Sequence, residues 1–182
     1  MKPINVQDEI AIESAAPAIW NTLTDISSWA RWTSLIKHAA AYGPIKAGTE
    51  FKFIASRWDF KGTIEAAEKE RLFACRAGFL GLALVATWNL EAIENACRLT
   101  FSIEASGWMT RLFAGRIRGS LEDIVFGWLY AIKRRCERGA DAGDATKPAA
   151  RLTRHSRMNI SHQNPLSSIF RLASRRKDEP DK

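Results

Sequence analysis

The sequence predicts an α+β fold, in which a curved antiparallel sheet of six to seven strands wraps around one long C-terminal helix. Three observations predict it. Apolar and polar residues alternate with period two through most of residues 37–107, which is typical of half-buried strands. Apolar residues then recur at steps of three and four over residues 108–138, as one face of a long helix requires. One strand and two short helices are predicted before the alternating region.

The first 36 residues predict that strand and the two short helices. Apolar residues alternate with polar ones from Ile4 to Glu13, and the following turn ends at Pro17. Proline suits the first turn of a helix, so we expect a short helix over residues 18–23. Asp25 is a suitable N-cap for the second helix, which extends toward Ile36.

The alternating region predicts a meander of strands joined by tight turns. Glycine, proline and asparagine lie between the alternating segments, where turns are expected. The predicted strands centre on residues 51–53, 60–66, 71–79, 82–92 and 99–105.

The segment from Trp108 to Arg138 is predicted to form a single long helix. Its apolar residues share one face and its charged residues the other. Gly115, Gly119 and Gly127 lower the intrinsic helix propensity, so packing against the rest of the protein must stabilise this helix.

The distribution of charge predicts one domain and a tail. Residues 1–138 hold 18 basic and 15 acidic residues, whereas residues 147–182 hold 9 basic and 3 acidic ones. We therefore expect a domain over residues 1–138 and a flexible linker with a basic, mostly disordered tail over residues 139–182. Because the domain is nearly balanced, no specific nucleic-acid partner is predicted. The tail has a basic amphipathic stretch, which predicts weak contact with an anionic membrane. Contact with RNA or the ribosome without sequence readout and a solvated tail without a fixed partner are the alternatives.

Cysteines, histidines and acidic residues predict neither a metal site nor a catalytic group. Cys75, Cys97 and Cys136 have no metal-ligand spacing, and the three histidines have no partner in a catalytic pattern. No glycine-rich phosphate loop is present, so no cofactor is expected. The chain shows no signal peptide and no apolar run of membrane-spanning length, which favours reduced thiols in the cytoplasm.

Four motifs resemble those of a known superfamily. The segment IAIESAAPAIW ends at Trp20, LTD ends at Asp25 and WARW ends at Trp32, and KAGTEF follows, ending at Phe51. Together they resemble START-like (SRPBCC) proteins of the polyketide cyclase/dehydrase type, over residues 4–138. The resemblance implies the helix-grip fold, with the long helix across the concave face of the sheet. Members of this superfamily bind lipids, sterols, polyketides, quinones or plant hormones, and a minority catalyse cyclisation or dehydration.

The resemblance also implies a ligand cavity between the sheet and the helix. Residues expected to point inward are those on the apolar faces of the strands and of the long helix, with two arginines as polar candidates. These candidates are Phe51, Phe53, Arg57, Phe60, Ile64, Arg76, Trp88, Leu90, Phe101, Ile103, Leu121, Val125, Trp128 and Ile132. Ordinary packing in a filled core remains the alternative for each apolar side chain.

These observations predict a protein that binds a hydrophobic small molecule, such as a lipid, a polyketide or another aromatic or isoprenoid-like compound, as a carrier or a sensor. Two alternatives stay open. The first is an enzyme that resembles the polyketide cyclases and dehydrases, for which no catalytic residue is predicted here. The second is a protein-interaction module of the same superfamily, with a filled interior and an exposed apolar surface.

Overall fold

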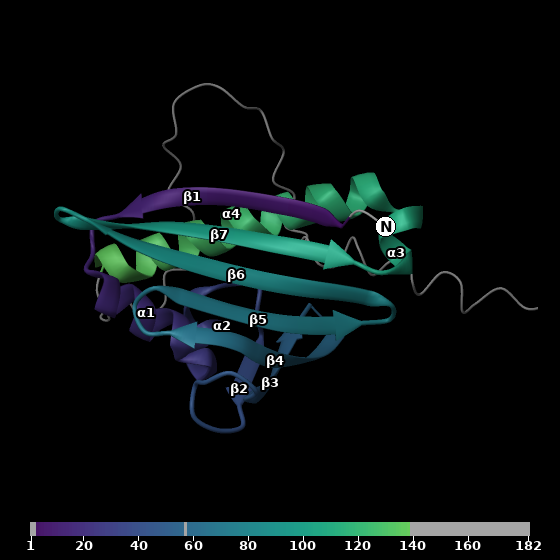
Figure 1. Cartoon of the computed structure of the whole chain (residues 1–182), viewed down its shortest axis with the longest axis horizontal. Helices are drawn as coiled ribbons and strands as arrows, with labels where there is room; N and C mark the ends of the chain where they lie inside the picture. The colour runs from purple at the N-terminus through teal and green to yellow at the C-terminus, as the bar shows by residue number, and fades with distance from the viewer. Residues whose placement is uncertain (1–2, 57, 139–182) are drawn as a thin grey trace, which may run out of the picture.

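Seven antiparallel strands form one sheet in the computed structural model, which describes residues 3–56 and 58–138. The strands are β1 (Ile4–Ile12), β2 (His38–Ala41), β3 (Glu50–Ala55), β4 (Trp58–Glu68), β5 (Leu72–Phe79), β6 (Leu82–Ile93) and β7 (Ala96–Ser106). Their spatial order is β1-β7-β6-β5-β4-β3-β2, so only β1 leaves the sequential meander, to pair with β7 (Figure 1). The predicted antiparallel sheet is confirmed.

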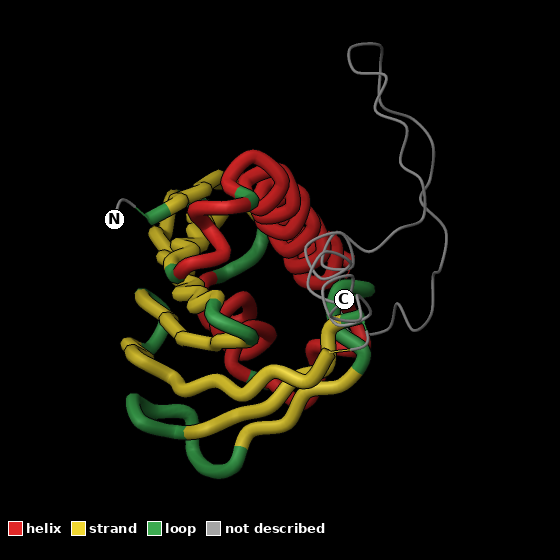
Figure 2. The backbone as a smooth tube through the Cα atoms, turned by 90° about the vertical axis from the view of Figure 1, so that its right-hand side faces the viewer, coloured by secondary structure: helices red, strands yellow, loops and turns green. Residues whose placement is uncertain are grey.

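The helices lie on one side of this sheet. They are α1 (Ala16–Thr24), the 3₁₀ turn η1 (Ile26–Ser28), α2 (Trp29–Trp32), α3 (Trp108–Leu112) and α4 (Ala114–Arg138). The strands bend around the interior, and α4 runs along the side that they leave open (Figure 2). This arrangement is the helix-grip fold that the resemblance implies.

Two predictions about the helices are corrected. The segment 108–138 is not one helix, because Phe113 has non-helical backbone angles and separates α3 from α4. The Phe113 side chain is partly buried and packs against the core at this break. Asp25 does not cap the following helix through its side chain, because its carboxylate accepts hydrogen bonds from Ser27 and Arg31 instead.

Tryptophans connect the helices to the sheet. The Trp128 ring of α4 is edge-on to the rings of Trp29 and Trp32, with ring centroids 5.1 Å apart in both pairs. It also lies 5.4 Å from Trp88 of β6. The Trp29 indole N–H donates a hydrogen bond of 2.9 Å to the carbonyl of Leu23, which fixes the end of α1 beside these rings. Offset and edge-to-face aromatic pairs of this kind stabilise a core beyond their buried area.

Gly62 allows a close approach within the sheet. It is buried on β4 opposite Phe51 of β3, and a Cβ at this position would lie 2.5 Å from the Phe51 ring and 2.8 Å from the carbonyl oxygen of Arg76. Both approaches are closer than side-chain atoms tolerate. The Phe51 ring can occupy this position only because residue 62 is a glycine. The shape of the concave face therefore depends on Gly62 as well.

We expect Gly62→Ala to lower the free energy of unfolding by about 2 kcal/mol, because the new methyl group overpacks the sheet. Gly78→Ala is the matched control on the neighbouring strand β5, where a Cβ meets only the Leu82 carbonyl oxygen at 3.5 Å. That control should change stability by less than about 1 kcal/mol, since alanine also restricts the unfolded chain. Urea denaturation of both variants measures the difference, and equal stabilities would contradict the close approach.

Candidate functional site

A cavity of about 80 Å³ lies between the concave face of the sheet and α4. Its walls come from β3, β5, β6, β7, α2, α4 and the segment that joins α2 to β2. The lining residues are Trp29, Leu35, Ile36, Phe51, Phe53, Cys75, Ala77, Leu84, Ala86, Trp88, Phe101, Ile103, Leu121, Ile124 and Trp128. All of these side chains are apolar, apart from the thiol of Cys75 and the indole N–H groups of Trp29, Trp88 and Trp128.

Small side chains on the central strands leave the space. Cys75 of β5, Ala86 of β6 and Ile103 of β7 lie side by side in register, and Ala77 pairs with Leu84 one step along. Larger aromatic side chains stand on either side of this region, so the small residues form a hollow in an otherwise filled surface.

The opposite wall is formed by α4 and the segment before β2. Leu121, Ile124 and Trp128 face the cavity from one side of α4. The Leu35 side chain packs against the same helix at Gly127, where a Cβ atom would lie 3.4 Å from it. A contact between this helix and a short connecting segment thus borders the cavity on this side.

Trp88 carries a polar group without a partner. Its indole Nε1 is buried and forms no hydrogen bond with any described residue. The ring is stacked on Phe101 at a centroid distance of 4.5 Å and is 2% exposed. A buried donor left unpaired costs about 1–3 kcal/mol. An acceptor atom that reached this nitrogen would remove this cost.

The Cys75 thiol also contributes a polar group to the lining. Burial raises the pKa of its thiol to about 12, and the negative charge of Glu65 adds to the shift. The thiol is therefore neutral near pH 7 and behaves as a small apolar group. No acidic, basic or histidine side chain lines the cavity within the part of the chain that the structure describes.

Half of the predicted site residues line this cavity. They are Phe51, Phe53, Trp88, Phe101, Ile103, Leu121 and Trp128. Five others are buried in the core around it rather than in its lining, namely Phe60, Ile64, Leu90, Val125 and Ile132. Arg57 lies outside the described residues.

The prediction that Arg76 reaches the interior is wrong. Cys75 and Ala77 point inward on β5, so Arg76 between them points to the outer face. There its guanidinium pairs with the Glu65 carboxylate, and its side chain is 60% exposed. Alternation within the strand would have excluded this residue, had the face of β5 been assigned from Phe73 and Cys75.

Several lining residues were not predicted. Cys75, Ala77, Leu84 and Ala86 follow the same alternation as Trp88, so the strand pattern could have identified them. Ile36 was expected at the end of the second short helix, but α2 ends at Trp32, and Leu35 and Ile36 lie in the irregular segment before β2. Their position depends on how the segment before β2 packs against α4.

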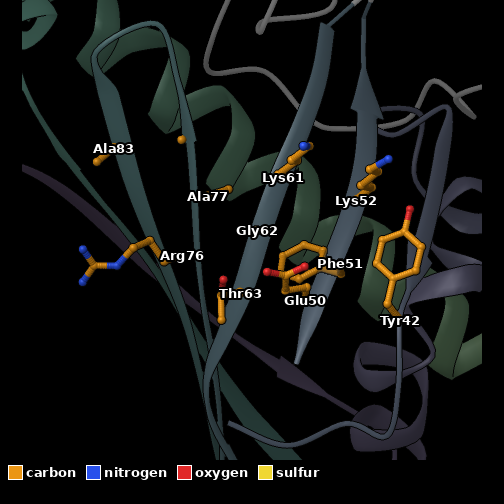
Figure 3. Close-up of a pocket in the computed structure, with 11 residues that line it drawn as sticks. Tyr42, Glu50, Phe51, Lys52, Lys61, Gly62, Thr63, Arg76, Ala77 and Ala83 are labelled. Carbon is orange, nitrogen blue, oxygen red and sulfur yellow. The ribbon is translucent and has the colours of Figure 1, made fainter. Parts of the chain in front are cut away.

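A second hollow of about 340 Å³ lies on the outer face of the sheet (Figure 3). Lys52 and Lys61 lie directly opposite each other on β3 and β4, and Glu50 and Thr63 are close by. The Lys52 ammonium lies 5.7 Å above the Tyr42 ring. This hollow is larger than the inner cavity, but charges of both signs line it, so it resembles ordinary protein surface.

The described residues form neither a metal-binding cluster nor a membrane-spanning helix. Residues 3–56 and 58–138 contain no group of three or more His, Cys, Asp or Glu side chains placed to hold a metal ion. Within the same ranges no helix is long and apolar enough to cross a membrane.

Comparison with known proteins gives a family and a fold. Residues 3–125 match the model of a family described as polyketide cyclase / dehydrase and lipid transport. No curated protein matches the chain in a sequence search.

Solved structures share the architecture. A hypothetical protein from Helicobacter pylori has a TM-score of 0.64 at 17% identity, over 72% of this chain and 86% of that one. The di-domain ARO/CYC protein BexL has a TM-score of 0.64 at 10% identity, over 74% of this chain and 50% of that one. A START superfamily protein from Mycobacterium smegmatis has a TM-score of 0.59 at 10% identity, over 74% of this chain and 97% of that one. Identities this low show the shared fold alone.

The raised pKa of Cys75 predicts a pH-dependent stability. The thiol keeps its proton in the folded state, to about pH 12, but loses it near pH 9 in the unfolded chain. The contribution of Cys75 to the free energy of unfolding is therefore complete below pH 9 and declines by about 1 kcal/mol per pH unit above it. Urea denaturation between pH 8 and about pH 11 should show this decline in the natural chain and a smaller one in Cys75→Ala. Parallel curves would contradict the assignment.

Proposed function

Because the chain belongs to the polyketide cyclase / dehydrase and lipid transport family, we propose that it binds a hydrophobic small molecule between the concave face of the sheet and α4, as a carrier or a sensor. Its membership confirms the resemblance stated from the motifs that end at Trp20, Asp25 and Trp32. The observation that carries the proposal is an apolar cavity, partly open to solvent, whose lining includes Trp88 with its buried, unpartnered N–H.

The lining supports a neutral ligand. A carboxylate or ammonium group would be buried without a counter-charge, because the described lining residues carry none. A single acceptor oxygen, as in a ketone, quinone, phenol or sterol, would satisfy the Trp88 N–H. Aromatic walls from Phe53, Trp88 and Phe101 favour a flat or slender molecule.

The size of the cavity sets a condition for binding. Pockets that hold drug-sized ligands are commonly about 300–1,000 Å³, whereas this cavity is about 80 Å³. A larger ligand therefore needs the walls to move apart. The walls can separate most easily where Leu35 contacts Gly127. α4 packs chiefly along β1 at the far edge of the sheet, so opening this contact leaves that packing in place.

The same lining favours binding over catalysis. Acid–base catalysis requires a group that gains or loses a proton near neutral pH. Cys75 is the only ionisable side chain in the described lining, and its thiol is neutral there. The three cysteines are free, which supports the reducing conditions of the cytoplasm as the place of action.

We expect Ala86→Leu to lower ligand binding roughly tenfold, because the larger side chain fills the hollow between Cys75 and Ile103. Ala83→Leu is the matched control, since it makes the same change on the same strand at a residue that lines the outer hollow. Native mass spectrometry of the full chain from its own host detects a bound molecule, and fluorescence of the neutral probe N-phenylnaphthylamine measures uptake. An empty protein that takes up no probe would contradict the proposal.

Trp88→Phe keeps an aromatic side chain and removes the N–H donor. We expect this variant to bind indanone roughly fivefold more weakly, because one hydrogen bond is lost, while its affinity for indane stays the same. The two compounds differ only in the ketone oxygen, so NMR titration of both separates the hydrogen bond from packing. Equal losses for both compounds would mean that the indole contributes its shape alone.

A further inference from the structure

Three large apolar side chains are exposed together at one end of the molecule. Leu80 occupies the turn between β5 and β6, and Trp108 and Leu112 lie one turn apart on α3. Each is more than half exposed. Figure 1 places α3 and the β5–β6 turn at the same end of the sheet. We call these three residues the apolar tip.

Two glycines allow the segments that bear the apolar tip to approach each other closely. Gly81 follows Leu80 with φ +78°, and a Cβ there would overlap the Trp108 indole. Gly107 precedes α3 with φ +116°, and a Cβ there would overlap the Gly81 carbonyl. Both backbone conformations favour glycine. The indole therefore lies directly against the β5–β6 turn, and the three apolar side chains belong to one surface.

Leu80 has an unusual backbone for its type. Its φ of +44° is left-handed, a conformation that leucine rarely adopts and that costs free energy. No burial offsets this cost, since the side chain is 56% exposed. Asparagine, aspartate or glycine is the usual residue at such a turn position. An apolar side chain kept there at a cost to stability points to contact with another body.

The charges along α3 and the start of α4 have one sign, whereas the exposed Asp59 of β4 lies two residues beyond the Lys61–Gly78 pair, near the β5–β6 turn. Arg111 lies on α3 between Trp108 and Leu112, and Arg116 and Arg118 follow in the first turns of α4. All three are exposed, and none forms an ion pair with a residue that the structure describes. The chain has no acidic residue between Glu104 and Glu122 or between Glu70 and Glu91.

We infer that the apolar tip is a docking surface for an anionic lipid bilayer. Tryptophan and leucine side chains insert at the boundary between headgroups and acyl chains, and arginines beside them bind anionic headgroups. A pair of exposed aromatic side chains elsewhere on the molecule lies beside acidic residues instead. Phe126 and Tyr130 stack on the outer side of α4, but Glu122 and Asp123 precede them by one turn.

The position of the apolar tip suits delivery or uptake of a ligand, a step that rests on the proposed function. Ala77 and Leu84 line the cavity three and four residues from Leu80 along the hairpin, and Leu121 lines it near the start of α4. Phe79 and Phe113, from the segments that bear the apolar tip, pack against the core. Docking would place this end of the cavity closest to the bilayer.

Sedimentation of the full chain with sucrose-loaded vesicles tests the inference. We expect binding to vesicles of phosphatidylcholine with phosphatidylglycerol, and W108S/L112S should weaken it roughly tenfold. F126S/Y130S removes two exposed aromatic side chains elsewhere and should leave binding within about twofold of the natural chain. R111Q/R116Q should weaken binding roughly fivefold per arginine, and only on the anionic vesicles.

Leu80→Asn separates docking from folding. Asparagine adopts the left-handed conformation more easily than leucine, so the melting temperature should stay the same or rise while vesicle binding falls. A loss of binding in this variant therefore cannot come from unfolding.

Three outcomes would overturn the inference. Equal losses in W108S/L112S and F126S/Y130S would show a general apolar effect. Unchanged binding in the tip variants, with loss only when Arg151, Arg154 and Arg157 are replaced, would assign the contact to the tail. A dimer in analytical ultracentrifugation that W108S/L112S dissociates, without vesicle binding, would assign the apolar tip to a second copy of the chain.

The two proposals fail separately. Uptake of N-phenylnaphthylamine in solution should be the same in W108S/L112S and in the natural chain, because neither residue lines the cavity. Probe uptake without tip-dependent vesicle binding would contradict docking alone. Tip-dependent vesicle binding without probe uptake would contradict the cavity proposal alone.

Discussion

The contact of Trp128 with Trp29 and Trp88 joins the three parts of this protein. One ring belongs to α4, one to the short helices and one to the middle of the sheet, and their centroids lie within 6.5 Å of one another. α4 has glycines in its interior and packs mainly along one edge of the sheet, so this cluster holds its middle over the concave face. The position of α4, the cavity beneath it and the packing of the segment between α2 and β2 all depend on this cluster.

A rigid aromatic cluster next to small side chains also explains why a cavity exists. Flat rings cannot spread into the hollow that Cys75, Ala77 and Ala86 leave on the central strands. Gly62 fixes the Phe51 ring on the far side of the hollow. The arrangement leaves the Trp88 N–H buried without a partner. Stability is reduced at the same place where a ligand would be recognised, as is common at functional sites.

The alternating and helical patterns by themselves determined the order of the strands and helices, apart from β2 and the break between α3 and α4. The motifs around Trp20 and Trp32 indicated the superfamily. The patterns also predicted seven of the cavity residues, because aromatic residues such as Trp88 and Phe101 must face the interior of a bent sheet. These features depend on period and composition, which are local properties that a sequence displays directly.

Only the tertiary structure decided which buried side chains line a cavity and which fill the core. Phe60 and Ile64 are as buried as Phe51, and they differ from it only in what packs above them. The break of the last helix at Phe113, the outward face of Arg76 and the position of Leu35 against Gly127 likewise follow from contacts between distant segments. A sequence records which residues avoid water, whereas the space between them depends on how all the elements pack together.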